Sequence, residues 1–334
     1  MREGLVKAAD RAVEIGATAL QIFTDNPTAW RRRSEPTPEI GPFRARLATA
    51  AIEPLAIHAS YLINLAGANP SDHERSVEIL AVELVSARRF GARLVNVHIG
   101  SHGGAGTGQG IERLVGAIRA AFDREQAAVD DDPELTDASP ARITLENTSG
   151  GGTSLGTSVD ELAAIADALD AAGLASDRIG FCLDTAHAWG AGYRLSDPEA
   201  LDALLVELDR RIGIDRLPLV HLNDSRSELG SRLDRHEHLG AGRIGEAGLA
   251  AVLRHPLLAG ATYILETPGM DEGYDAINVA RAFALARGEP LEPLSPEAFH
   301  LRSGRTRAAT PVEVEAATEP EPAARAADTL PAAR

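Results

Sequence analysis

Two hydrophobic periods alternate along most of the chain. Short apolar runs, bounded by polar or turn-forming residues, are typical of buried strands. Longer stretches with apolar residues three or four positions apart are typical of amphipathic helices. Strands are predicted at 18–23, 55–58, 93–98, 142–146, 178–184, 217–221 and 261–266. Helices are predicted at 4–15, 71–90, from about residue 111, and at 159–172, 198–212, 246–254 and 273–287.

Strands and helices follow one another with short connections, which indicates a parallel sheet covered by helices. This repetition, close to eight times within roughly 290 residues, favours a (β/α)8 TIM barrel over an open doubly wound sheet. No glycine-rich phosphate loop follows the strand at 18–23, which argues against a dinucleotide-binding fold. The helix at 4–15 has no strand before it. We therefore predict a barrel that lacks its first strand at the N-terminus.

The composition divides the chain into two regions. Residues 1–288 carry the alternating pattern and form the predicted TIM-barrel catalytic domain. Residues 289–334 are rich in Pro, Ala, Glu and Arg, so we interpret them as a largely disordered extension, with a passive tail from residue 303. Residues 125–141 are acidic and turn-rich, and we predict a surface loop there.

Charge and cysteine content narrow the possible functions. The formal net charge of −16 gives no global indication of nucleic-acid binding, although a local cationic groove or bound metal ions can supply the attraction. The single cysteine, Cys182, excludes an internal disulfide and a cysteine-based zinc knuckle. There is no apolar run of membrane-spanning length and no apolar core of a secretory signal at the N-terminus. We expect a cytoplasmic protein with no membrane partner.

Ionisable side chains stand at the ends of most predicted strands. A lone histidine at a strand end needs no special explanation, because strand ends meet water. Here six successive strands end this way, and the carboxyl ends of parallel barrel strands open on one face. The side chains are His58, His98, Glu146, Asp184, His221 and Glu266, with His187 three residues after Asp184 and the pair Asp234 and His236 in the polar loop that follows His221.

Five imidazoles and four carboxylates on one face predict a metal centre. Crowded carboxylates without counterions would repel one another and take up protons. Divalent cations remove this repulsion, and neutral imidazoles with carboxylates suit zinc first, then manganese or iron. Nine ligands exceed one tetrahedral site and suit two or three ions, with a carboxylate such as Glu146 bridging two of them. Multi-metal centres of this kind hydrolyse phosphate esters.

Seven segments carry these side chains: 58–65 (HASYLINL), 96–102 (NVHIGSH), 145–148 (LENT), 182–187 (CLDTAH), 221–224 (HLND), 234–245 (DRHEHLGAGRIG) and 265–268 (LETP). In these segments the chain resembles the endonuclease IV family, zinc-dependent apurinic/apyrimidinic endonucleases with a xylose-isomerase-like barrel. The resemblance covers about residues 4–287. It implies an enzyme of DNA repair.

The resemblance implies three zinc ions, and we expect that manganese can substitute at one site. The first ion would be held by His58, His98 and Glu146. The second would be held by Glu146 as a bridge, Asp184, His221 and Glu266. The third would be held by His187, Asp234 and His236. Water activated by these ions would attack the phosphate 5′ to an abasic site in double-stranded DNA, with Glu146 as the residue on which catalysis most depends, and blocked 3′ ends would also be trimmed.

The resemblance also implies residues that contact DNA. An abasic nucleotide leaves the duplex at little cost, because no base pairs or stacks there. Side chains from barrel-top loops would fill the gap: Arg31, after Trp30, and Tyr61 with Leu62, after His58. Ordinary loop packing would also explain Tyr61 and Leu62, and any arginine of the run 31–33 can contact phosphate. We expect a monomer on its DNA.

Two other functions stay open from the sequence. A sugar isomerase or epimerase on the same kind of barrel would need one or two ions, and the Asp234–His236 pair and Tyr61–Leu62 argue against it. An inactive, truncated homologue kept for binding is the other. Nicking of an abasic duplex that EDTA abolishes would separate the endonuclease from both.

The start of the chain departs from the family pattern. The family begins with a strand that reads roughly Gly-Ala-His-Val-Ser, whereas this chain starts at Met1, already beyond that segment. We expect that the recorded start lies downstream of the true one or that the gene is truncated, although no metal ligand is lost. Expression with and without an upstream extension tests this, and equal solubility, melting temperature and zinc content would refute it.

Overall fold

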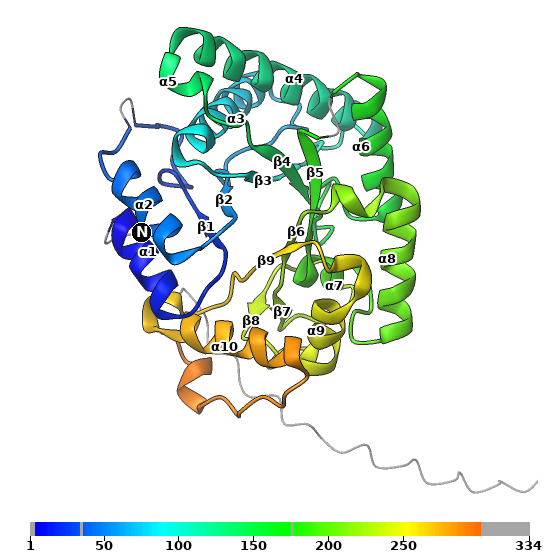
Figure 1. The fold of residues 1–334 in the computed structure, drawn as a ribbon. Coiled ribbons are helices and arrows are strands. Elements are labelled where there is room, and N and C mark those ends of the chain that lie inside the picture. Colours follow the sequence, from blue (N-terminus) through cyan, green and yellow to red (C-terminus); the bar gives the residue numbers. More distant parts are fainter. Residues whose placement is uncertain (1–3, 34–35, 175–176, 302–334) are drawn as a thin grey trace, which may run out of the picture.

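The computed structural model describes residues 4–33, 36–174 and 177–301. Within these ranges a parallel sheet curves into a nearly closed barrel that helices surround (Figure 1). Its seven strands, in spatial order, are β1 (Leu20–Ile22), β2 (Leu55–His58), β3 (Leu94–His98), β4 (Arg142–Glu146), β5 (Ile179–Asp184), β6 (Leu219–His221) and β9 (Thr262–Ile264). This confirms the predicted barrel and its seven strands.

The helices of the described ranges begin and end close to the predicted positions where a prediction was made. They are α1 (Leu5–Glu14), α2 (Ile40–Ala50), α3 (Pro70–Phe90), α4 (Thr107–Asp131), α5 (Pro133–Thr136), α6 (Val159–Ala171), α7 (Thr185–Ala191), α8 (Pro198–Ile212), α9 (Gly245–Arg254) and α10 (Tyr274–Arg287). A small hairpin of β7 (Asp224–Ser225) and β8 (His236–Glu237) lies in the connection from β6 to α9. Short 3-10 turns are η1 (Ile214–Arg216), η2 (Pro256–Leu258), η3 (Met270–Glu272) and η4 (Pro296–Phe299).

Side-chain caps explain where several helices begin. Asn69 accepts hydrogen bonds from the amides of Ser71 and Asp72, at 3.0 and 3.2 Å, and so satisfies donors that the first turn of α3 leaves open. Ser158 and Glu161 cap α6 together: the Ser158 hydroxyl accepts from the Glu161 amide, and the Glu161 carboxylate accepts from the amide of Thr157. These local signals are readable from the sequence.

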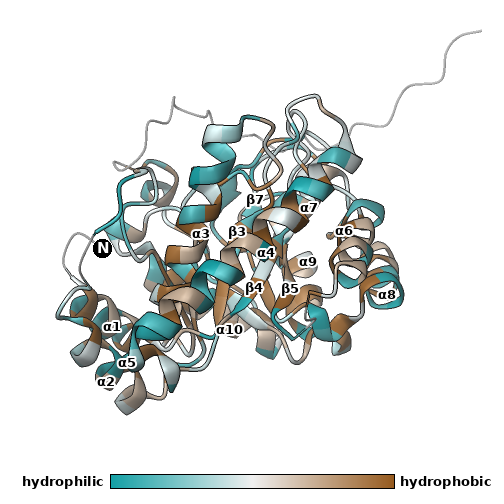
Figure 2. Ribbon diagram, turned by 90° about the horizontal axis from the view of Figure 1, so that it is seen from above, coloured by the Kyte–Doolittle hydropathy of each residue, from teal (hydrophilic) through white to brown (hydrophobic). Residues whose placement is uncertain are grey.

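Two separate apolar regions border the sheet. The larger one packs the outer side of the strands against the helices, and in Figure 2 the central strands are mostly brown while the outer helices mix teal with brown. The smaller one, here called the apolar plug, fills the barrel and consists of Ala56, Leu94, Cys182, Leu219 and Ile264. Because side chains alternate across a strand, residues two positions further along also point into the barrel. The next inward-facing position on these strands, beyond the apolar plug, carries a polar or ionisable side chain.

The edges of the sheet are β1 and β9, since neither has a second neighbour among the described strands. Side chains join them: the Gln21 amide on β1 donates to a carboxylate oxygen of Glu266, just past β9, at 3.1 Å. The hypothesis of a missing first strand in the natural protein stays a prediction.

The predicted loop at 125–141 covers only residues 137–141, and the prediction was wrong for the residues before them. The helix α4 continues through Asp131, and α5 follows from Pro133. Glu125 is buried there and pairs with Arg88 at 2.6 Å and with Arg178 at 2.7 Å. The acidic residues of this segment led us to predict a solvent-exposed loop. Glu125 instead neutralises two arginines that come from distant parts of the chain.

Part of the predicted C-terminal extension is described. Residues 289–301 run back against the barrel, with η4 in this segment and Ala298 buried. The remaining residues, 302–334, lie outside the described ranges, so the disordered tail stays a prediction.

We expect Glu125→Ala to lower the free energy of unfolding by about 3 kcal/mol, because it leaves two guanidinium groups without their buried partner. Urea unfolding followed by circular dichroism measures the change. The matched control is Glu112→Ala, an exposed acid on the same helix, for which the change should stay within about 0.5 kcal/mol. Equal effects of the two substitutions would contradict the assigned role of Glu125.

Candidate metal centre

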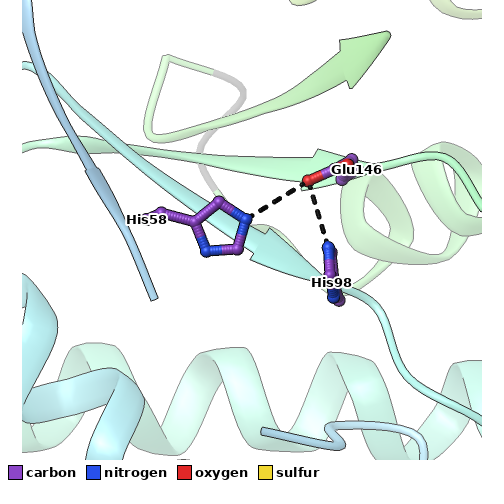
Figure 3. A group of neighbouring side chains, drawn as sticks. All are labelled: His58, His98 and Glu146. Atoms are coloured by element: carbon purple, nitrogen blue, oxygen red, sulfur yellow. Dashed lines mark ion pairs between the residues drawn. The ribbon is translucent and has the colours of Figure 1, made fainter. Parts of the chain in front are cut away.

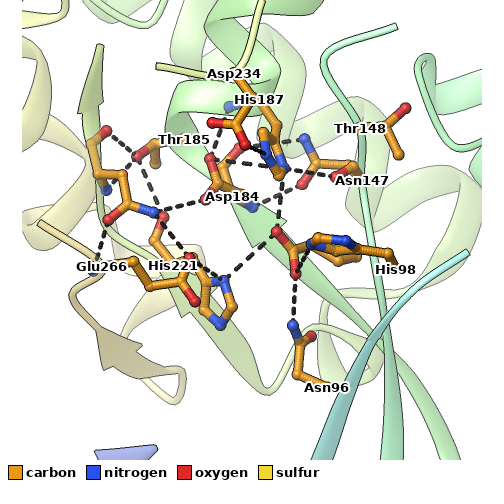
Figure 4. A network of polar contacts seen from close by, with 12 residues as sticks. Asn96, His98, Asn147, Thr148, Asp184, Thr185, His187, His221, Asp234 and Glu266 are labelled. Carbon is orange, nitrogen blue, oxygen red and sulfur yellow. Dashed lines mark hydrogen bonds and ion pairs between the residues drawn. The ribbon is translucent and has the colours of Figure 1, made fainter. Parts of the chain in front are cut away.

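The nine predicted ligands lie at the carboxyl end of the barrel. Figure 4 labels His98, Asp184, His187, His221, Asp234 and Glu266 among them. His58, Asp184, His221 and Glu266 each stand two residues after a member of the apolar plug, so the strand alternation turns them inward. In the parallel register His98 is the neighbour of Glu146 and Asp184 is the neighbour of His221, so the ligands of these two pairs lie side by side.

Glu146 lies at the centre of the cluster. One oxygen, Oε2, is 3.7 Å from His58 Nε2 and 3.5 Å from His98 Nε2 (Figure 3). The other, Oε1, is 3.1 Å from His187 Nδ1 and 3.5 Å from His221 Nδ1. Its two oxygens thus face two different groups of imidazoles, which is the arrangement that a bridging ligand needs.

His187 reaches the centre through a helix cap. Asp184 ends β5 and is the N-cap of α7, with its Oδ1 accepting the His187 amide at 2.7 Å. The same aspartate therefore offers its other oxygen to the centre and fixes the first turn of α7. Sequence reasoning placed both residues in the site but did not predict the seven-residue helix that begins between them.

Asp234 and His236 come from the β7–β8 connection. Oδ1 of Asp234 is 3.0 Å from His236 Nε2, and its Oδ2 is 3.3 Å from His187 Nε2. His236 is also anchored to the segment after the last strand, because its Nδ1 lies 2.9 Å from the carbonyl oxygen of Glu266. The pair predicted to lie in a loop thus includes a residue of a short strand, and it closes one side of the site.

Hydrogen bonds to the backbone determine which nitrogen each ring presents. Nδ1 of His58, His187 and His236 lies 2.8–3.0 Å from a carbonyl oxygen, which only accepts, so this nitrogen carries the hydrogen and Nε2 faces the centre. In His221 the order is reversed. Gln21 donates through Nε2 to Glu266, so its Oε1 accepts from His221 Nε2 at 3.1 Å and leaves His221 Nδ1 free to bind.

The atoms left without partners are those that would bind metal. Glu146 Oε1, His221 Nδ1 and His236 Nε2 are buried and have no hydrogen-bond partner. Potential ligand atoms gather in three overlapping groups: His58, His98 and Glu146; Glu146, Asp184, His221 and Glu266; and Asp184, His187 and His236. A buried orphan atom is costly unless something binds it. The donor set and these orphans fit several divalent cations.

Cys182 is close enough to form a fourth group with Glu146 and His221. Burial raises the pKa of its thiol to about 12, so it stays protonated near neutral pH. A thiol binds metal as the thiolate. Cys182 also belongs to the apolar plug by its packing.

Electrostatics in the metal-free centre are those of an ion-pair network. Burial opposes ionisation of Glu146, but the imidazoles of His221 and His98 outweigh it and hold the pKa of Glu146 well below its ordinary value. Burial likewise opposes a charged His236, yet its bond to Asp234 raises the pKa of His236 to about 9. Protons on imidazoles thus supply the positive charge that metal ions would supply.

Three asparagines that sequence reasoning missed orient the ligands. Asn96 donates to Glu146 Oε2 at 2.5 Å, and Asn223 donates to Asp184 Oδ2 at 2.6 Å. Asn147 accepts the Asp184 amide at 2.6 Å and donates to its carbonyl oxygen. Each lies within two residues of a predicted ligand, and this spacing was a signal that could have found them.

The predicted DNA contacts lie outside the ligand cluster. Tyr61 is half exposed, and its ring centroid is 5.3 Å from that of His58 and 5.9 Å from that of His98. Leu62 is partly buried beside it, and Arg31 is exposed on the connection after β1. Tyr61 is therefore at the rim of the centre, whereas no contact joins Arg31 to the predicted ligands among the interactions of the described residues.

Known proteins with similar sequences and structures share this barrel. A family profile described as a xylose isomerase-like TIM barrel matches residues 9–287. A protein of Methanoculleus marisnigri named "Probable endonuclease 4" is 41% identical over 280 residues, covering 84% of this chain and 94% of the relative. One of the same name from Halothermothrix orenii is 40% identical over 281 residues, covering 83% and 95%. The crystal structure of endonuclease IV from Thermus thermophilus has a TM-score of 0.71 at 36% identity, covering 86% and 96%.

Fold and site together define a xylose isomerase-like TIM barrel with clustered side chains that could hold metal ions. Within that class the chain belongs to the endonuclease IV family, which confirms the predicted family and enzyme class. Sugar epimerases also share the barrel, such as a D-tagatose 3-epimerase-like protein with a TM-score of 0.59. At 17% identity that likeness shows the fold alone.

Zinc binding should release protons in a pH-dependent way. The raised pKa of His236, about 9, means that this ring holds a proton at pH 7.5 that metal must displace. Calorimetric titration in buffers of different ionisation enthalpy should show at least one more proton released at pH 7.5 than at pH 10. Equal proton release at the two pH values would contradict the ion-paired description of the metal-free centre.

The same pair should make stability of the metal-free protein depend on pH. Because the folded pKa of His236 lies above its ordinary value, the contribution is complete below about pH 6.5 and is lost as pH rises through about 9. Asp234→Asn should weaken this loss in urea unfolding between these pH values. The control Asp202→Asn, at an exposed pair with His255, should keep the wild-type slope.

Proposed function

We propose that this endonuclease acts in DNA repair, cleaving the phosphodiester bond 5′ to an abasic site in double-stranded DNA and trimming blocked 3′ ends. The observation that carries the proposal is the convergence of nine ligand side chains at one barrel end, with orphaned buried atoms at their centre. Endonuclease relatives at about this chain's full barrel length support the reaction type.

We assign three zinc ions to the three groups. His58, His98 and Glu146 would hold the first. Glu146, Asp184, His221 and Glu266 would hold the second. His187, Asp234 and His236 would hold the third, since Asp234 lies between the two rings. Bound zinc would supply a water of lowered pKa and positive charge for the attacked phosphate and the leaving oxygen, and manganese would substitute at one site.

The side chains determine how a phosphate could approach this centre. The protein carries a net charge of −16, so a DNA strand is not attracted by the molecule as a whole. Six positive charges from three zinc ions would exceed the charge of the carboxylates of Glu146, Asp184, Asp234 and Glu266. The loaded centre would therefore be net positive and would attract the diester locally.

We place the DNA contacts at the rim. Tyr61 would stack in the space left by an extruded abasic nucleotide, with Leu62 beside it, because its half-exposed ring already borders the first ligand group. Arg31 would contact phosphate from the neighbouring connection. No helix in the described ranges is long and apolar enough to cross a membrane. We further propose that the enzyme works as a monomer in the cytoplasm.

Glu146→Gln tests the central assignment. It removes the bridging charge and should lower nicking of an abasic duplex by about a thousandfold or more, with an unchanged circular dichroism spectrum. The control Glu228→Gln alters an exposed acid paired with Arg243 and should leave the rate unchanged. Substantial nicking by Glu146→Gln, or nicking by the wild type that survives EDTA, would overturn the proposed mechanism.

Arg31→Ala should weaken binding to every duplex by a similar factor and should lower the slope of log affinity against log salt by about 1. Tyr61→Ala should instead reduce the preference for an abasic over an intact duplex. Fluorescence anisotropy across a salt series measures both effects. Arg46→Ala, which removes a surface arginine paired with Asp10, is the control. If Arg31→Ala behaves like this control, Arg31 has no contact with DNA.

A further inference from the structure

Residues 289–301, here called the C-terminal strap, touch both chain segments that leave the metal centre. We propose that this strap, acting through the buried His238, is a positioning element that holds His236 and Asp234 in place for the third metal ion. The inference rests on the proposed function for the existence of that ion. It concerns residues outside the nine ligands and a segment expected from sequence to be largely disordered.

The β7–β8 hairpin cannot hold its own geometry. It consists of two residues on each strand, with Asp224 opposite Glu237 and Ser225 opposite His236. Isolated ladders of this length are not stable in water. Asp234 lies outside the ladder and is itself exposed. The position of this ligand pair must therefore be determined by what the hairpin packs against.

His238 is the contact that joins the hairpin to both α10 and the strap. It is fully buried, two residues after His236, and both ring nitrogens are bonded. The Asn278 amide of α10 donates to Nδ1 at 2.9 Å, so Nδ1 accepts and Nε2 carries the hydrogen. Nε2 then donates to the carbonyl oxygen of Ala298 in the strap at 3.0 Å. One neutral imidazole thus joins the hairpin, α10 and the strap.

A second connection runs in parallel through Arg281 of α10. Its Nε donates to the carbonyl oxygen of Leu239 at 2.6 Å, and its Nη1 donates to that of Glu292 in the strap at 2.6 Å. The amide of Leu239 is bonded in turn to Asn278 Oδ1 at 3.0 Å. The backbone directly after His238 is therefore fixed to the same helix and strap.

Apolar packing completes the contact. The Phe299 ring lies 6.1 Å from the His238 ring, with an interplanar angle of 84°. Gly240 has φ 75°, and a Cβ there would come within 2.7 Å of Leu291 Cδ1, so the strap and this turn are in close contact. A Cβ on Gly269, after Glu266, would be 3.0 Å from Leu301 Cδ2. The strap therefore spans the segments that follow both His236 and Glu266, which His236 Nδ1 already connects.

The geometry explains why the two imidazoles of this segment have different roles. His236 turns Nε2 toward the carboxylates of Asp234 and Asp184 at the centre, whereas both ring nitrogens of His238 are bonded to groups outside the centre. Partners behind the ligands commonly change metal affinity by about 10- to 100-fold when removed. His238 is not itself a catalytic residue, so its loss should act on retention of one metal ion.

Three substitutions of His238 in the full-length protein separate its two bonds. His238→Ala removes both. His238→Gln can place an amide donor near the Nε2 position and keep the bond to Ala298. His238→Asn has a shorter side chain that can reach only the Asn278 side. The control is His300→Ala, which removes an exposed imidazole of the same strap that is bonded to Pro296.

The measurement is zinc content after purification, followed by the time course of zinc release to a coloured chelator. We expect three ions in the wild type, with one released about 10-fold or more faster in His238→Ala and His238→Asn, and the other two unchanged. His238→Gln and His300→Ala should release zinc as the wild type does. Steady-state nicking at saturating zinc should recover most of the wild-type kcat in His238→Ala, with KM for DNA unchanged.

The outcomes distinguish this inference from the proposed function. Wild-type protein that holds fewer than three zinc ions would contradict the proposed trinuclear centre. Three ions with no faster release in any variant would leave that centre standing and overturn the positioning role. Faster release of all three ions together with a collapse of the melting temperature would also overturn it, because His238 would then support the fold in general. If His238→Ala is insoluble, the difference between Gln and Asn decides.

Discussion

The crowding of four carboxylates among five imidazoles is the constraint on which this molecule depends. Charges taken out of water must be neutralised, and Glu146, Asp184 and His221 are almost wholly enclosed. In the metal-free protein, protons on His187, His221 and His236 perform this neutralisation, which is why the pKa values of these rings are raised. Divalent cations would replace the protons without any change in which atoms face the centre.

Hydrogen bonds within the protein organise the site. Backbone carbonyl groups orient three rings, Gln21 orients a fourth, and asparagines beside the ligands orient the carboxylates. A ligand held in this way loses little conformational freedom on binding, so more of the binding energy is retained. The apolar plug lies beneath the ligands and excludes water on that side. On the opposite side, beside the half-exposed Tyr61, the centre is open to a large substrate.

The barrel by itself does not select the chemistry. Sugar epimerases with 12–17% identity share the fold, including a D-psicose 3-epimerase at a TM-score of 0.57. In this chain the family assignment depends on segments at the strand ends and in the β7–β8 connection. Those segments are built from ligands, their asparagine partners and the anchor at His238, so the function is encoded in a small part of a common scaffold.

Periodicity and strand-end chemistry were sufficient to predict the barrel, its seven strands and the nine side chains that it brings together, because alternation along a strand and parallel strand direction are properties of local sequence. Sequence reasoning failed where partners are distant. Glu125 resembled part of a solvated loop because its arginine partners are 37 and 53 residues away. The sequence analysis predicted no role for His238, whose contact with the strap joins residues 60 positions apart. Tertiary structure alone decided these pairings. It also decided which nitrogen of each ring faces inward and which imidazoles each Glu146 oxygen faces. All of these depend on distances of about 3 Å between segments that only the folded barrel brings together.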